Sequence, residues 1–142
     1  MQVAGRPAVA VVALGVLGLQ LVATLVALVA NLPSQSGDAG DDAASEFVLR
    51  GTAISAPVVP LVVLVVAGLL ALRQDRWGAV GTVGILVLSV LIVAGSLSEA
   101  TAEATPDVSK AVLVASGLVG SAIGVALFVL GILELRRRRR PA

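Results

Sequence analysis

The side chains that could do polar chemistry in this 142-residue chain are few, and they stand inside long apolar stretches. Thr82, Ser89 and Ser96 follow one another at intervals of seven residues, which places their hydroxyls on one stripe of a helix. Gln20 and Thr24 are four residues apart and also share a helix face. Such side chains either line a polar path through a membrane or hydrogen-bond with neighbouring helices. The spacing leaves both interpretations open, and we favour the second.

The sequence lacks the residue types from which most enzymatic and metal sites are built. It contains no cysteine and no histidine, which excludes disulfides, thiolate nucleophiles and imidazole bases or ligands. Asp38, Asp41 and Asp42 do not have the spacing of a calcium-binding loop, so we interpret them as part of a solvated loop. Aromatic residues make up 2% of the chain, which leaves few rings to hold a cofactor. We therefore expect no enzymatic activity, no metal and no cofactor.

The composition excludes a soluble domain. Hydrophobic residues make up 58% of the chain, charged residues only 13%, and the mean hydropathy is +1.05. Soluble domains contain about 25% charged residues, so this chain has roughly half the charge needed to cover a globular surface. A disordered chain is excluded as well, because disorder requires a low hydrophobicity. The polar stripes must therefore be held by elements that lie inside a membrane.

Four apolar stretches have the length of a membrane-crossing helix, which is about 20 residues. Because backbone N–H and C=O groups must pair with one another within lipid, we predict that each stretch forms a helix. The first stretch is too long for the apolar region of a cleaved signal peptide, so we expect it to be retained. We predict helices at 8–32, 53–72, 77–97 and 106–135, outer loops at 33–52 and 98–105, an inner loop at 73–76 and a basic tail at 136–142.

Prolines mark the predicted helix ends. Pro33 follows the first stretch and should end it, because proline cannot continue the hydrogen-bond ladder. Pro57 and Pro60 fall in the opening turns of the second stretch, where the missing N–H is least costly. Thr105 and Pro106 have the residue types of an N-cap and a first helical residue, so they predict the start of the fourth helix.

These elements predict an all-α integral membrane protein with four transmembrane helices in an antiparallel bundle and no extramembrane domain. The seven-residue period of the polar stripe recurs among glycines of the last helix, and this period favours a left-handed bundle. We expect these glycines to pack against a helix of the same chain, with a partner protein or a second copy as the alternative. The glycines are Gly117, Gly120, Gly124 and Gly131.

The basic residues predict the orientation in the membrane. If the N-terminus is cytoplasmic, eight of the ten Lys and Arg residues lie on the cytoplasmic side, and Arg50 and Lys110 lie outside. The positive-inside rule therefore places both termini in the cytoplasm. Arginine far outnumbers lysine, and Ala, Val, Leu and Gly dominate, which is typical of bacteria with GC-rich genomes. We expect the plasma membrane of a bacterium.

Five consecutive arginines follow the last predicted helix. We interpret them as a topological anchor that also contacts anionic lipid headgroups, at about 1 kcal/mol per basic residue near the surface. A tail of this length, without interleaved aromatics or a folded module behind it, is not expected to bind nucleic acid. These residues are Arg136, Arg137, Arg138, Arg139 and Arg140.

Two functions remain open. The first is a non-enzymatic accessory, scaffold or assembly subunit that acts through helix–helix contacts, with the glycine stripe as a packing or partner face. The second is a small channel or facilitator whose polar path is lined by the amide and hydroxyl residues named at the start. We favour the first, because no ionisable side chain stands near the middle of a predicted span, where ion-coupled transporters carry such groups.

Overall fold

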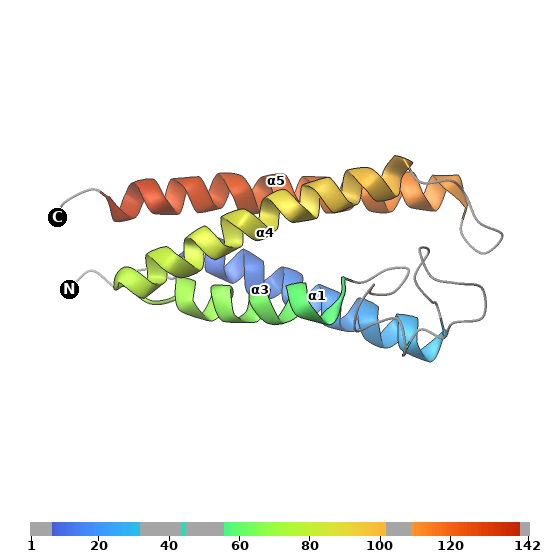
Figure 1. Ribbon diagram of the computed structural model, residues 1–142, viewed down its shortest axis with the longest axis horizontal. Helices are drawn as coiled ribbons and strands as arrows, with labels where there is room; N and C mark the ends of the chain where they lie inside the picture. Colours follow the sequence, from blue (N-terminus) through green and yellow to red (C-terminus); the bar gives the residue numbers. More distant parts are fainter. Residues whose placement is uncertain (1–6, 32–43, 45–55, 102–108, 140–142) are drawn as a thin grey trace.

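A computed structural model of the chain describes residues 7–31, 44, 56–101 and 109–139. Within these ranges the protein is all-helical, without a strand, as the sequence predicts (Figure 1). The predicted outer loop at 33–52, with Asp38, Asp41 and Asp42, lies outside the described residues apart from Ala44. The four described helices are α1 (Ala8–Val29), α3 (Val58–Ala71), α4 (Arg76–Thr101) and α5 (Lys110–Arg138).

Three of the described helices are long and apolar enough to cross a membrane, namely α1, α4 and α5. They contain 22, 26 and 29 residues. At a rise of 1.5 Å per residue they are about 33, 39 and 44 Å long, whereas the hydrocarbon core of a bilayer is about 30 Å thick. The apolar helix α3 has 14 residues and is therefore only about 21 Å long. The structure thus gives full spanning length to three of the four predicted spans.

Two prolines explain why α3 begins at Val58. Pro57 is its N-cap, with an extended backbone at ψ 160°, and the first backbone bond of the helix runs from Leu61 N–H to the Pro57 carbonyl oxygen. Pro60 is the third helical residue, whose N–H would have no partner within the helix in any case. The predicted start at residue 53 lies outside the described residues.

The other helix ends also differ from the prediction by a few residues. Helix α1 ends at Val29 instead of residue 32, because Asn31 adopts a left-handed backbone with φ 49°, which asparagine tolerates better than most residues. Helix α5 begins at Lys110 instead of residue 106. Its N-cap is Ser109, whose Oγ accepts a hydrogen bond from the N–H of Val112 at 3.4 Å. The predicted cap at Thr105 lies outside the described residues.

Two helices continue into segments that we predicted as loop and tail. Helix α4 reaches Thr101, four residues past the predicted end, because the segment 98–101 contains neither glycine nor proline to stop it. Helix α5 reaches Arg138, so the first three arginines of the predicted tail are helical. The predictions of an outer loop from 98 and a tail from 136 are therefore wrong in their first residues.

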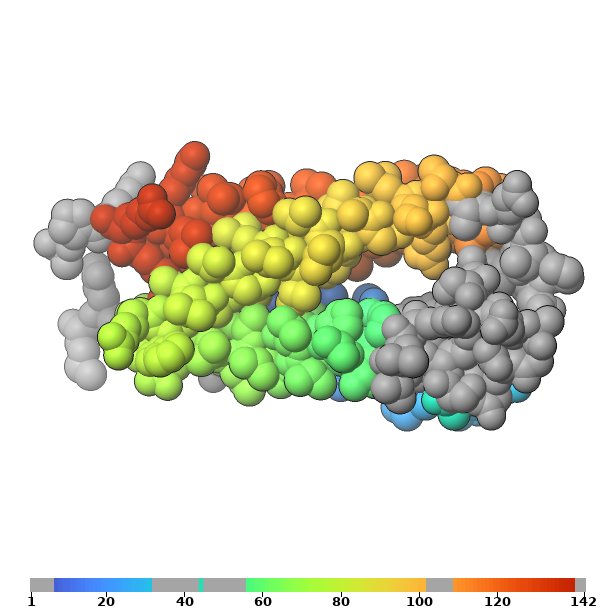
Figure 2. All heavy atoms as spheres, viewed as in Figure 1, coloured from blue at the N-terminus to red at the C-terminus, as the bar shows by residue number. Residues whose placement is uncertain are grey.

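Consecutive helices run in opposite directions (Figure 1). The start of α1, the turn between α3 and α4, and the end of α5 lie together at one end of the molecule, which we call the basic end. Helix α5 packs along α4, and α1 packs against α3 and α5. Helix α3 contacts α4 near their shared turn, and the two separate toward the far half of α4 (Figure 2).

The buried core lies in the half of the molecule nearer the basic end. All four helices contribute to it, and alanines make up much of it, so the backbones can approach closely. Elsewhere most of the large aliphatic side chains are exposed, including Val22 and Leu25 on α1 and Leu118 and Val125 on α5. The buried core residues are Val9, Ala10, Ala13, Leu64, Ala67, Ala71, Ile85, Leu88 and Leu127.

Candidate functional site

The glycine stripe of α5 packs against α4 of the same chain. A Cβ added to Gly117 would lie 2.5 Å from the Cβ of Ala100 and from the carbonyl oxygen of Ser96. One added to Gly124 would lie 2.6 Å from a methyl of Val93, and one added to Gly131 would lie 2.7 Å from Leu86. These separations are shorter than van der Waals contact. At Gly117 the Cβ would meet backbone, so the two helices can approach this closely there only because the residue is glycine; at Gly131 it would meet the end of a leucine side chain.

The contacts repeat with the period predicted from the sequence. Each seven-residue step along α5 is matched by a seven-residue step back along α4, as expected for antiparallel helices with a heptad repeat. Gly120 also belongs to this contact, because its missing side chain leaves room for the hydroxyl of Ser96. The stripe therefore packs against α4 inside the chain.

The hydroxyl stripe of α4 is enclosed rather than open. Thr82 and Ser89 are fully buried, and Ser96 lies beside the glycines of α5. The Thr82 hydroxyl donates to the carbonyl oxygen of Gly78 at 2.8 Å, and the Ser89 hydroxyl donates to that of Leu86 at 2.7 Å. Both hydroxyls are therefore satisfied by the backbone of their own helix, at positions where neighbouring helices pack tightly.

The polar pair on α1 makes a different contact. Thr24 is buried and donates to the carbonyl oxygen of Gln20 at 2.8 Å. The Gln20 side-chain oxygen accepts a hydrogen bond from the N–H of Ala56 at 3.1 Å, just before α3 begins. Among the described residues, no hydrogen bond joins this pair to the hydroxyls of α4. The described hydrogen bonds thus do not join the five predicted lining residues into one path.

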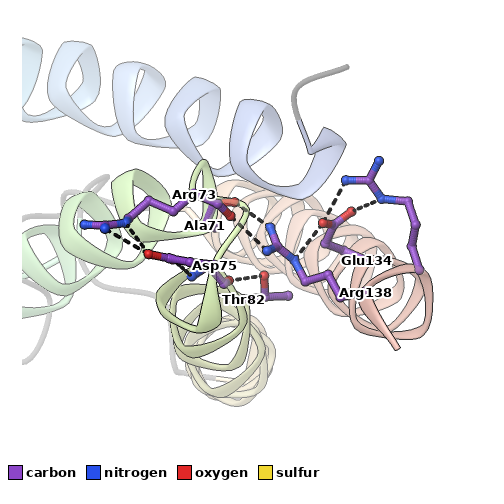
Figure 3. A network of polar contacts seen from close by, with 8 residues as sticks. Ala71, Arg73, Asp75, Thr82, Glu134 and Arg138 are labelled. Carbon is purple, nitrogen blue, oxygen red and sulfur yellow. Dashed lines mark hydrogen bonds and ion pairs between the residues drawn. The ribbon is translucent and has the colours of Figure 1, made fainter. Parts of the chain in front are cut away.

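A polar network that the sequence analysis missed lies at the basic end, where α5 reaches the turn between α3 and α4 (Figure 3). The guanidinium of Arg138 donates from Nη2 to the carbonyl oxygen of Ala71 at 2.8 Å and from Nη1 to that of Arg73 at 2.9 Å. Ala71 is the last residue of α3, so its carbonyl has no partner within the helix. Arg138 therefore caps α3 from another helix, with its positive charge at the negative end of the helix dipole.

Glu134 holds Arg138 in this position. The Glu134 carboxylate is only 6% exposed, and its Oε1 lies 2.7 Å from Nε of Arg138, an ion pair without hydrogen-bond geometry. Arg137 donates two hydrogen bonds to the same carboxylate, from Nε at 2.9 Å and from Nη2 at 3.0 Å. One buried acid is thus neutralised by two arginines. These two arginines of the predicted tail contact protein groups, and contact between the five arginines and lipid headgroups stays a prediction.

Asp75 closes the turn from the other side. Its Oδ1 accepts from the backbone N–H groups of Trp77 at 3.0 Å and Gly78 at 3.3 Å, so it caps the start of α4. Its Oδ2 accepts from the Arg73 side chain at 2.8 Å. Partial desolvation raises the pKa of the Asp75 carboxyl, but these hydrogen bonds and the Arg73 charge outweigh it and hold the pKa below its ordinary value.

Gly78 is the residue that lets these parts meet. A Cβ at this position would collide with the carbonyl oxygen of Arg73 and with the guanidinium of Arg138.

In the sequence, only the spacing of Glu134 and Arg138, one helical turn apart, indicates an ion pair within this network. Nothing in the sequence indicates that Arg138 reaches α3.

The comparisons with known proteins give no relative: no family model, curated protein or solved structure matches this chain. The candidate site therefore stands on its geometry. Its described groups hold three helices together through charges and backbone caps at one end of the molecule.

Proposed function

We propose that this chain is an integral membrane protein whose helices cross the bilayer as an antiparallel bundle, with both termini in the cytoplasm. The support is the surface of the three long helices, which is apolar and mostly exposed, and which only lipid or another apolar surface can cover. Helix α3, together with the residues before it, is the fourth span of this proposal. The basic end is its cytoplasmic end.

Cysteine labelling tests this topology directly, because the chain contains no cysteine of its own. Ser36→Cys in the first outer loop should react with a membrane-impermeant maleimide in intact cells. Gln74→Cys in the turn between α3 and α4 should react only after the cells are opened. Labelling of both positions in intact cells, or of neither position before lysis, would contradict the proposed orientation.

Within the membrane, we propose that the protein serves as a non-enzymatic accessory or scaffold subunit. The observation that carries this proposal is that the close-packing glycines and buried hydroxyls are all used inside the chain. The outer surface of the bundle carries exposed apolar side chains, for example Val22 on α1 and Val125 on α5, and a partner protein could pack against them. A channel lined by the amide and hydroxyls gains no support, because the α4 hydroxyls bond to their own helix and lie in tight contacts.

Site-specific photo-crosslinking tests the scaffold role. A photoreactive amino acid at Val22 or Val125, both exposed, should form a crosslink of defined mass to a companion protein in the native membrane. The same amino acid at Leu127, which is buried, is the matched control and should give crosslinks only within the chain. Lipid adducts alone at both exposed positions, together with a lone monomer after purification in mild detergent, would overturn the accessory-subunit proposal.

A further inference from the structure

The basic end carries more positive charge than its own acids neutralise. Six described arginines lie there, with two acids, Asp75 and Glu134. Asp75 pairs with Arg73, and Glu134 pairs with Arg137 and Arg138. Both acids are thereby used. Among the described residues, Arg76 has no carboxylate partner, although it is exposed and is the first residue of α4.

Arg76 borders a shallow surface depression of about 390 Å³ that is lined by Arg76, Trp77 and Val80. The guanidinium carbon of Arg76 lies 5.9 Å from the centre of the Trp77 ring. The indole is 47% exposed, and Val80, one turn further along α4, is 52% exposed. The depression therefore runs from a cation through an aromatic ring to an aliphatic side chain, along a helix long enough to cross a membrane.

This order of groups matches the order of groups in a phospholipid. Guanidinium groups bind phosphate oxygens through charge-assisted hydrogen bonds. Tryptophan is enriched at the level of the lipid headgroups, where one side of its ring is wet and the other apolar. An aliphatic side chain one turn deeper lies at the level where the acyl chains begin. The charge of Arg76, which no described carboxylate neutralises, favours a headgroup with a net negative charge.

We propose that the depression lined by Arg76, Trp77 and Val80 binds an anionic phospholipid, with the phosphate on Arg76 and the acyl chain along Val80. This proposal rests on the membrane insertion proposed above. It assigns lipid recognition to the start of α4, whereas the sequence analysis assigned it to the arginines at the end of α5. Two of those arginines are already bound to Glu134.

Trp77 is the only tryptophan of the chain, and the chain has no tyrosine, so its fluorescence reports on this depression alone. The protein is reconstituted in phosphatidylcholine vesicles that contain increasing fractions of brominated phosphatidylglycerol or brominated phosphatidylcholine. Bromine quenches tryptophan only at short range. We expect brominated phosphatidylglycerol to quench Trp77 with a binding constant about fivefold higher than that of brominated phosphatidylcholine. This ratio corresponds to the free energy that one basic residue near an anionic lipid provides.

Two variants locate the effect. Arg76→Gln should remove the preference for phosphatidylglycerol, and it should not disturb folding because Arg76 makes no described hydrogen bond. Arg136→Gln is the matched control, because Arg136 is an exposed arginine of α5 that does not line the depression. We expect it to keep the preference. Equal losses in the two variants, or no preference in the unmodified protein, would overturn the proposed site.

The same experiment separates this proposal from the proposed membrane insertion. If brominated phosphatidylcholine quenches Trp77 and phosphatidylglycerol quenches it no better, the protein is inserted and the lipid site is refuted. If neither brominated lipid quenches Trp77, the proposed insertion itself is contradicted, and the lipid site falls with it.

Discussion

The guanidinium of Arg138 lies 2.8 Å from the carbonyl oxygen of Ala71, although 67 residues separate the two in the sequence. This contact joins the end of α5 to the end of α3 and gives the Ala71 carbonyl a donor from another helix. The Arg73 carbonyl and the buried Glu134 carboxylate complete the surroundings of the guanidinium. The last turn of α5 is therefore joined to the turn between α3 and α4.

Replacing Arg138 tests the strength of this cap. Arg138→Ala removes the donors for the carbonyls of Ala71 and Arg73 and one of the two charges on Glu134. We expect a loss of about 1–3 kcal/mol in the free energy of unfolding, the range for leaving a buried polar group unsatisfied. Thermal unfolding in detergent, followed by Trp77 fluorescence, measures the change. Arg136→Ala, at an exposed position, should change the unfolding temperature little, and an equal shift in both variants would refute the cap.

Adding one methyl group to the glycine stripe tests the packing of α4 on α5. In Gly117→Ala the new Cβ meets the backbone of Ser96 and the Cβ of Ala100, so the two helices must separate. We expect a destabilisation of about 1–3 kcal/mol, as found for overpacked cores. Gly95→Ala is the control, because nothing lies within 4 Å of its added Cβ. Denaturant titration of both variants measures their free energies of unfolding. Equal values for the two variants would contradict the close approach of α4 and α5 at Gly117.

Stability measured at acidic pH tests whether the charged carboxylate of Asp75 stabilises the fold. Because its folded-state pKa lies below the ordinary value of 3.8, the charged carboxylate stabilises the folded protein. This contribution is complete above the unfolded-state value and disappears as the pH falls through the lower folded-state value. Asp75→Asn should therefore be less stable than the unmodified protein at pH 6, and the difference should shrink below pH 3.8. A difference that does not depend on pH would mean that the Asp75 charge plays no part.

Gln20 separates the structural interpretation of the polar residues from the channel interpretation. Gln20→Leu removes the acceptor for the Ala56 N–H and should cost about 0.6 kcal/mol of stability, a typical value for such contacts within membranes. Solute flux through proteoliposomes should be the same with Gln20→Leu as with the unmodified protein. Gln74→Leu, at an exposed position in the turn, serves as the control for both measurements. Flux that depends on Gln20 would restore the channel hypothesis.

The sequence predicts the helices well because length and hydropathy decide them, whereas local side-chain chemistry decides their ends. The end of α1 depends on the left-handed backbone of Asn31, and the start of α5 depends on the Ser109 cap. The nearby prolines, Pro33 and Pro106, indicate helix ends a few residues away, and composition does not show that Asn31 and Ser109 set the ends instead. The heptad spacing of the glycines predicts a close helix contact, but not whether the facing helix belongs to the same chain.

The polar network could not be predicted in the same way. Its parts are single residues on α3, α4 and α5, and their meeting depends on the register of α5 against α4, which the contacts of Gly131 and Gly78 help to set. In the sequence Arg138 is one of five consecutive arginines, and its spacing from Glu134 indicates an ion pair but no contact with α3. Only the fold makes Arg138 a cap and leaves Arg136 exposed.

The cap that Arg138 supplies to α3 also has a consequence in time. The ribosome adds roughly 5–20 residues per second, so about 3–13 seconds pass between the synthesis of Ala71 and that of Arg138. During this interval the carbonyls of Ala71 and Arg73 lack the Arg138 donor, and the nascent α3–α4 hairpin is not yet joined to the end of α5. A translation product that stops before α5 would lack the Arg138 donor for these two carbonyls permanently.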